Sequence, residues 1–128
     1  MPRLKLQKGQ TTVEFALILP IFFTIMFLII QFGMLFFCWF SVTQAAREGV
    51  RSAAVGVSYG AVEGNLRRGI QGDRLQFTWD TAEGALAVGE PVGLRVTLPT
   101  TGIVIFPEFS SYFPATISGY AVMRVENL

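Results

Sequence analysis

Chemistry in this chain would have to come from few residue types, because the sequence has nine Asp and Glu, one cysteine, Cys38, and no histidine. The absence of histidine removes the commonest general base and metal ligand. The sequence contains no recognisable catalytic carboxylate pair, nucleophile motif, phosphate-binding loop or metal-ligand spacing. It therefore predicts a protein that is not an enzyme, with no catalytic residue, cofactor, metal or small-molecule substrate.

One carboxylate, Glu14, stands directly before the uncharged run 15–40. The positive end of the helix dipole favours a carboxylate in the first turn of a helix, but an unpaired charge becomes costly at the edge of an apolar run. Lys8 is one candidate partner. If the chain were cut between Gly9 and Gln10, the new amine of Gln10 would be another, one helical turn from Glu14. In a bundle, that amine could neutralise Glu14 of a neighbouring subunit.

The run 15–40 is long enough to cross a bilayer. As a helix it would measure roughly 39 Å, against roughly 30 Å for the hydrocarbon core. A cleaved secretory signal with a site at Thr43-Gln44-Ala45 is the alternative, but the apolar part of a signal spans only about 7–15 residues. Cys38 is expected to be an apolar residue of the membrane segment. Pro20 predicts a kink, either a flexible point for leaving the bilayer or entering a filament, or an incidental one.

The charges beside this run predict its orientation. Arg3, Lys5 and Lys8 precede it, and the positive-inside rule keeps such residues in the cytoplasm. We therefore expect a single-pass protein of the cell (inner, cytoplasmic) membrane, with the N-terminus cytoplasmic and the C-terminal part extracytoplasmic. The net charge of only +1 gives no reason to expect nucleic acid as a partner.

A long helix is expected at residues 10–56, with the membrane segment at about residues 15–40. Beyond the membrane segment, small side chains recur at every fourth position of this helix. They are Ser41, Ala45, Gly49 and Ala53. Such a stripe allows close helix packing, so it could contact other helices. It could equally receive the chain's own C-terminal domain, and the sequence leaves both readings open.

Residues 57–128 predict a small, pilin-like α+β domain with a short helix and a three-stranded antiparallel sheet. A helical face is marked by Tyr59, Val62, Leu66 and Ile70. Alternating apolar residues predict strands at 75–79 and 92–98, and residues 117–125 form a third β-rich run. The stretch 102–113 is unusually apolar and aromatic. Burial in the core is expected for it, with contact to the bilayer surface or to a partner as alternatives.

Several blocks of the sequence resemble a known family. A basic leader ending in Gly9, with Glu14 at the fifth position after it and Phe15 next, is similar to the type IV prepilin and pseudopilin pattern. Longer blocks look more narrowly like the TadE-like proteins of tight-adherence pilus systems. These blocks are Val13–Pro20, Gln31–Gly33, Ala45–Arg51 and Ala121–Glu126. Gln31 departs from the pattern, because the family often has Glu at that position.

The resemblance implies a minor pilin or pseudopilin required for assembly of a tight-adherence (type IVb-like) pilus. It implies a prepilin peptidase that cuts between Gly9 and Gln10 and removes the basic leader 1–9, with Glu14, Phe15 and Pro20 in recognition and assembly. The partners would be the membrane, other pilins or TadE-like proteins, and the pilus assembly machinery, and the chain could reside in a pilus. The alternative is a permanently membrane-anchored, extracytoplasmic binding or adhesion module that is neither processed nor incorporated into a filament.

Overall fold

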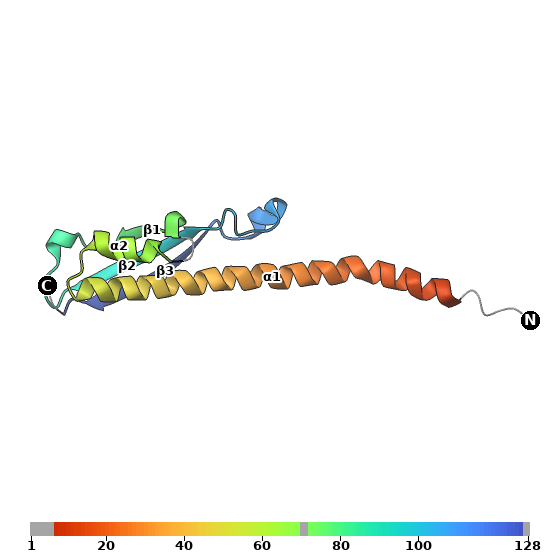
Figure 1. Ribbon diagram of the computed structural model, residues 1–128, viewed down its shortest axis with the longest axis horizontal. Helices are drawn as coiled ribbons and strands as arrows, with labels where there is room; N and C mark the ends of the chain where they lie inside the picture. Colours follow the sequence, from red (N-terminus) through yellow and green to blue (C-terminus); the bar gives the residue numbers. More distant parts are fainter. Residues whose placement is uncertain (1–6, 70–71, 127–128) are drawn as a thin grey trace, which may run out of the picture. The chain divides into compact units, whose positions relative to one another are not determined.

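A computed structural model describes residues 7–69 and 72–126 (Figure 1). Most of the predicted leader, with Arg3 and Lys5, and Ile70 of the predicted helical face lie outside these residues. The main elements are, in chain order, α1 (Gln7–Ala54), α2 (Tyr59–Arg67), β1 (Gln76–Trp79), β2 (Pro91–Pro99) and β3 (Thr116–Arg124). The predicted α+β fold, with a long apolar helix, a short helix and a three-stranded antiparallel sheet, is confirmed.

The chain divides into two compact units, Met1–Met34 and Leu35–Leu128, and the division falls within α1. The described part of the first unit is helix alone. The second unit contains the last twenty residues of α1, 35–54, together with α2 and the sheet. The C-terminal part of α1 is therefore part of the folded domain.

The first unit exposes apolar side chains along its length. Within the described residues, one helical segment, Gly9–Ala54, is long and apolar enough to cross a membrane, and its most apolar window has a mean hydropathy of 2.6 with no part buried. Pro20 lies inside the helix, which continues on both sides of it. The hydroxyl of Thr24 donates a 2.8 Å hydrogen bond to the carbonyl of Pro20. This side chain is thus satisfied by its own helix, as an apolar surrounding requires.

α1 ends in a turn that only glycine adopts easily. Gly56 has a φ of 88°, in the left-handed region. Its N–H donates to the carbonyl of Ala53 at 3.0 Å, and the N–H of Val57 donates to the carbonyl of Ser52 at 3.1 Å. This pair of bonds is a Schellman motif, which satisfies carbonyls at the end of a helix. The chain then leads into α2.

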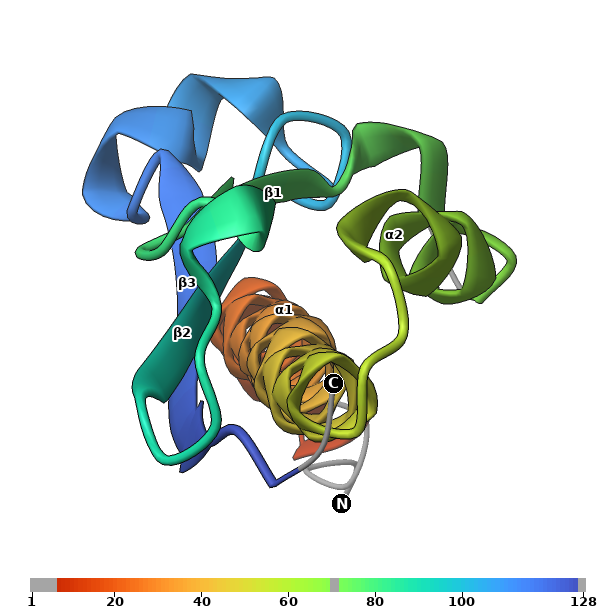
Figure 2. The same ribbon diagram turned by 90° about the vertical axis from the view of Figure 1, so that its left-hand side faces the viewer.

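The sheet has the order β1-β2-β3, with β2 paired antiparallel to both neighbours. Seen along the helix, β2 and β3 lie on one side of the C-terminal part of α1, and α2 lies on another (Figure 2). The alternation predicted for the central strand is confirmed by its buried residues, which are Val92, Leu94, Val96 and Leu98. These side chains belong to the core between the sheet and the two helices.

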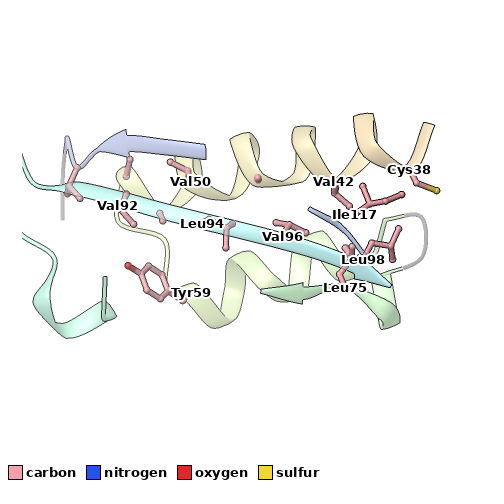
Figure 3. Packing of buried hydrophobic residues seen from close by; sticks show 14 of the residues in the cluster. Cys38, Val42, Val50, Tyr59, Leu75, Val92, Leu94, Val96, Leu98 and Ile117 are labelled. Atoms are coloured by element: carbon pink, nitrogen blue, oxygen red, sulfur yellow. The ribbon is translucent and has the colours of Figure 1, made fainter. Parts of the chain in front are cut away.

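α1 contributes a stripe of its own to this core. Its buried residues recur at helical spacing and include Cys38, Val42, Ala46 and Val50. In Figure 3 the strand residues follow the helix, with Val92 near Val50 and Leu98 near Cys38. β2 therefore runs along α1 towards helix residue 38. Cys38, expected in the apolar membrane segment, is 5% exposed and belongs to the core of the domain.

The stretch 102–113, which we call the aromatic loop, connects β2 and β3 and contains a short 3-10 helix, Pro107–Tyr112. Core burial was expected for it, and this expectation is wrong for most of its large side chains. Ile103 is buried, but Phe106 is 41%, Phe109 56% and Tyr112 81% exposed. Hydrophobicity alone did not indicate burial, and of these four side chains only Ile103 belongs to the core cluster.

Candidate functional site

The proposed cleavage and assembly residues lie at the beginning of α1. The helix starts at Gln7, so the peptide bond between Gly9 and Gln10 lies inside it. Gly9 is exposed, and a Cβ atom added to it would meet nothing within 4 Å. The side-chain amide of Gln10 donates a 3.0 Å hydrogen bond to Oε1 of the exposed Glu14. The i,i+4 spacing of Gln10 and Glu14 on the helix brings these two side chains together.

This hydrogen bond orients the Glu14 carboxylate without cancelling its charge, because an amide is a neutral donor. A positively charged donor at the same place would make a shorter and stronger bond. Directly after the carboxylate begins a surface of exposed apolar side chains, starting with Phe15 at 64% exposure. The arrangement places an anionic group at one end of an apolar helix surface, and a role of Glu14 in recognition or assembly stays a prediction.

The stripe of small residues lies partly inside the chain. Ser41 and Ala45 are half-buried, whereas Gly49 and Ala53 are buried. A Cβ on Gly49 would lie 2.4 Å from Cδ2 of Leu94 and 3.1 Å from Cδ1 of Leu66. The sheet and α2 therefore approach α1 closely at this glycine. A role of the stripe in packing between subunits stays a prediction, and only its Ser41 and Ala45 end retains exposed surface.

Gly119 was not singled out from the sequence, yet it sets the contact between β3 and α1. A Cβ on Gly119 would lie 2.7 Å from the backbone nitrogen and Cα of Thr43, and 2.7 Å from the carbonyl carbon of Val42. The strand and the helix backbone are in direct contact there. A glycine at an inward-facing strand position is the only signal that could have indicated such an approach.

A cavity of about 370 Å³ lies between α1, α2 and β2. Its apolar lining includes Phe37, Cys38, Val42, Leu66, Leu75 and Leu98, and its polar lining consists of Ser41 and Asn65. The Ser41 hydroxyl already donates to the carbonyl of Phe37 at 2.8 Å. The lining has no carboxylate or cation, and the thiol of Cys38 is its one titratable group.

The outer face of the sheet carries a small polar cluster. The Tyr120 hydroxyl donates a hydrogen bond to Oδ2 of Asp80, and the Arg95 guanidinium lies 5.1 Å from the centre of the Tyr120 ring. The hydrogen bond to Asp80 is the main reason why the pKa of Tyr120 is raised above its ordinary value. Each of these groups is paired within the cluster. Their contacts indicate a stabilised surface rather than a reactive one.

The aromatic pair formed by Tyr59 of α2 and Trp79 of β1 is also structural. The rings of Tyr59 and Trp79 are stacked with centroids 3.8 Å apart, and the Trp79 indole donates to Glu63 at 2.8 Å. Burial, followed by the nearby charge of Glu83, raises the pKa of Tyr59. In the part of the chain that the structure describes, no group of three His, Cys, Asp or Glu could hold a metal ion.

Comparison with known proteins places one segment in a family. Residues 9–51 match the family model described as TadE-like protein. Searches of curated proteins and of solved structures gave no match. The matched segment begins at Gly9 and covers most of α1, whose length and apolar character indicate single-pass membrane anchoring. The family is one of structural and assembly components connected with tight-adherence pili. The match over residues 9–51 supports the classification of this chain as a TadE-like protein.

Proposed function

We propose that this chain is a minor pilin or pseudopilin required for assembly of a tight-adherence pilus. It is anchored by α1 in the cytoplasmic membrane, with its N-terminus in the cytoplasm and its α+β domain outside. The observation that carries the proposal is the family match, which begins at Gly9 and follows α1 to Arg51. The continuous apolar helix and the compact domain at its far end support it.

The proposal includes cleavage by a prepilin peptidase between Gly9 and Gln10. In the uncut chain the backbone nitrogen of Gln10 is part of a peptide bond within α1, and the side-chain amide is the donor to Glu14. After the cut, that nitrogen becomes a charged amine one helical turn from Glu14. Cleavage therefore adds a cationic donor beside the neutral amide, and Glu14 of the same or of a neighbouring chain could bind it.

The pair formed by the new amine and Glu14 is important because the helix lies in lipid. The apolar surface after Glu14 is as well accommodated by lipid tails as by other apolar helices, so hydrophobicity does not drive the helix from the membrane into a filament. Polar contacts at the edge of the apolar surface can then decide register and partner. Glu14 is the acidic residue that directly borders the run 15–40.

The test is complementation of a host from which this chain has been deleted. We expect wild type to restore surface pili, and Glu14→Gln to fail although the variant accumulates in the membrane. Glu48→Gln is the matched control, because Glu48 is an exposed carboxylate of the same helix within the folded domain. Normal piliation of the deletion strain, or full rescue by Glu14→Gln, would overturn the proposal.

A further inference from the structure

The aromatic loop combines exposed rings with almost no charge. Ile105, Phe106, Phe109 and Tyr112 are all at least 41% exposed, and Glu108 is the single charged residue between positions 100 and 115. The rings of Phe106 and Phe109 meet edge to face at 6.4 Å, and those of Phe109 and Tyr112 lie 6.3 Å apart. This cluster is the largest concentration of exposed aromatic side chains in the chain beyond α1.

The loop leaves the domain at the end where α1 enters it. Gly49 of α1 lies against Leu94, and Val42 and Thr43 lie against Gly119. Further along, Leu98 lines the same cavity as Phe37 and Cys38 (Figure 3 shows Leu98 near Cys38). From Leu94 to Leu98, β2 thus runs along α1 towards helix residue 38, and the chain continues into the aromatic loop soon afterwards.

The aromatic loop begins beside the part of α1 where the apolar run 15–40 ends. About 20 helical residues cross the hydrocarbon core, so a span that starts near Phe15 ends near residue 34. The residues that follow are aromatic and exposed on α1. They are Phe36, Phe37, Trp39 and Phe40, each at least 50% exposed. Tryptophan is enriched at the boundary between a membrane and water, so Trp39 favours such a boundary at this level of α1.

The base of the loop is fixed by hydrogen bonds. The Thr100 hydroxyl donates to the carbonyl of Pro114 at 2.6 Å, and its N–H donates to the carbonyl of Ala115 at 3.0 Å. Arg74 donates to the carbonyl of Thr101 at 3.1 Å and lies against Gly102, whose φ of 87° is in the left-handed region. These hydrogen bonds hold the two ends of the loop together. Less conformational entropy is therefore lost when the rings bind.

We propose that the aromatic loop inserts Phe109 and Tyr112 into the interfacial region of the same bilayer that α1 crosses, as a second contact of the domain with the membrane. The rings supply an apolar body and, at Tyr112, a polar hydroxyl that suits the headgroup region. The segment 100–115 has no Lys or Arg, and Arg74 at its base is held by the carbonyl of Thr101, so we expect insertion without anionic lipid. The proposal goes beyond the pilus function and requires only that α1 spans a membrane.

The experiment uses the full chain in nanodiscs of phosphatidylcholine, with an environment-sensitive fluorophore attached to Tyr112→Cys. Val88→Cys is the matched control, because Val88 is a 66% exposed apolar residue in the loop before β2, at the other end of that strand. We expect blue-shifted emission at position 112 and quenching by lipids spin-labelled near the headgroup, with neither effect at position 88. Exchange of some phosphatidylcholine for phosphatidylserine should leave the quenching at 112 unchanged.

Native Cys38 is buried, so labelling can be performed with it present, and Cys38→Ala provides a second background. Equal, unquenched emission at positions 112 and 88 would overturn the proposal. A blue shift at position 112 that appears only when two copies share a disc would also overturn it. That result would mean that the loop contacts a second copy of the chain. A pilus defect without loss of quenching would affect the pilus proposal alone.

Discussion

Gly119 of β3 lies directly on the backbone of Thr43 in α1. A Cβ atom at Gly119 would be 2.7 Å from the nitrogen and from the Cα of Thr43, closer than such atoms approach in proteins. Gly119 also pairs with Val96 at the centre of the sheet. This contact joins the sheet to the helix that carries the TadE-like segment, and so fixes where the domain lies on the last part of α1.

Gly119→Ala is expected to destabilise the domain. The methyl group would meet backbone atoms of Val42 and Thr43, which cannot rotate away as a side chain can. Overpacking of this kind costs about 1–3 kcal/mol. Urea unfolding of the detergent-solubilised chain in a Trp39→Phe background, in which Trp79 is the single tryptophan, measures the loss by fluorescence.

Gly64→Ala is the control, and its expected effect on stability has the opposite sign. Gly64 lies inside α2, and an added Cβ meets nothing within 4 Å. Replacing a helical glycine by alanine should stabilise the chain by about 0.5–1 kcal/mol. Equal effects of the two substitutions would contradict the close approach at Gly119.

The hydrogen bond from Trp79 to Glu63 should contribute to the attachment of α2. Trp79→Phe keeps an aromatic ring to stack on Tyr59 but removes the 2.8 Å hydrogen bond to the carboxylate. We expect a loss of about 1 kcal/mol, since the site is only partly buried. A double-mutant cycle with Glu63→Ala isolates the interaction, and strictly additive losses would show that the two side chains do not interact.

Stability should fall at high pH, in part because of Tyr120. The hydrogen bond to Asp80 raises the pKa of Tyr120 in the folded chain, so the folded state holds this proton more tightly than the unfolded state. The contribution is present in full below the unfolded value of about 10 and is lost as the pH rises through the folded pKa. Tyr120→Phe should therefore flatten the decrease of unfolding free energy above about pH 10, and unchanged slopes would argue against the hydrogen bond.

Gln10→Ala and Glu14→Gln should separate the two donors available to Glu14. Gln10→Ala removes the side-chain amide but leaves the amine that cleavage would create at the same position. Glu14→Gln keeps the shape and removes the charge. If the amine is the partner in assembly, piliation should persist with Gln10→Ala and be lost with Glu14→Gln. The reverse order would assign the role to the amide of Gln10.

Much of the fold could be predicted, because its signals are local. The alternation of Val92, Leu94, Val96 and Leu98 predicted the central strand and its inward face, and all four are buried. The run 117–125 coincides with β3 to within one residue at each end. The helical spacing of Tyr59, Val62 and Leu66 predicted α2, whose buried residues are Tyr59 and Val62.

The parts that were not predicted depend on tertiary contacts. The apolar run continues past the point where α1 enters the domain, so composition did not reveal that Cys38 packs against the sheet. The aromatic loop is rich in hydrophobic residues, yet Phe109 and Tyr112 are exposed, and the core is built from other residues. At the candidate site, the sequence predicted that the amine of a cleaved Gln10 would lie near Glu14, which stays a prediction, and it did not indicate the hydrogen bond from the Gln10 side-chain amide. The contact of Gly119 with Thr43 left no periodic signal.

The central claim is that the chain is a processed pilus-assembly component, and its mature N-terminus tests this most directly. Intact-mass and N-terminal peptide measurement of the chain extracted from membranes of its native host should find Gln10 as the first residue. Gly9→Val should prevent the change in mass, because the bulk of valine would block the peptidase at the bond between residues 9 and 10. A mature wild-type chain that still begins at Met1 would contradict the account.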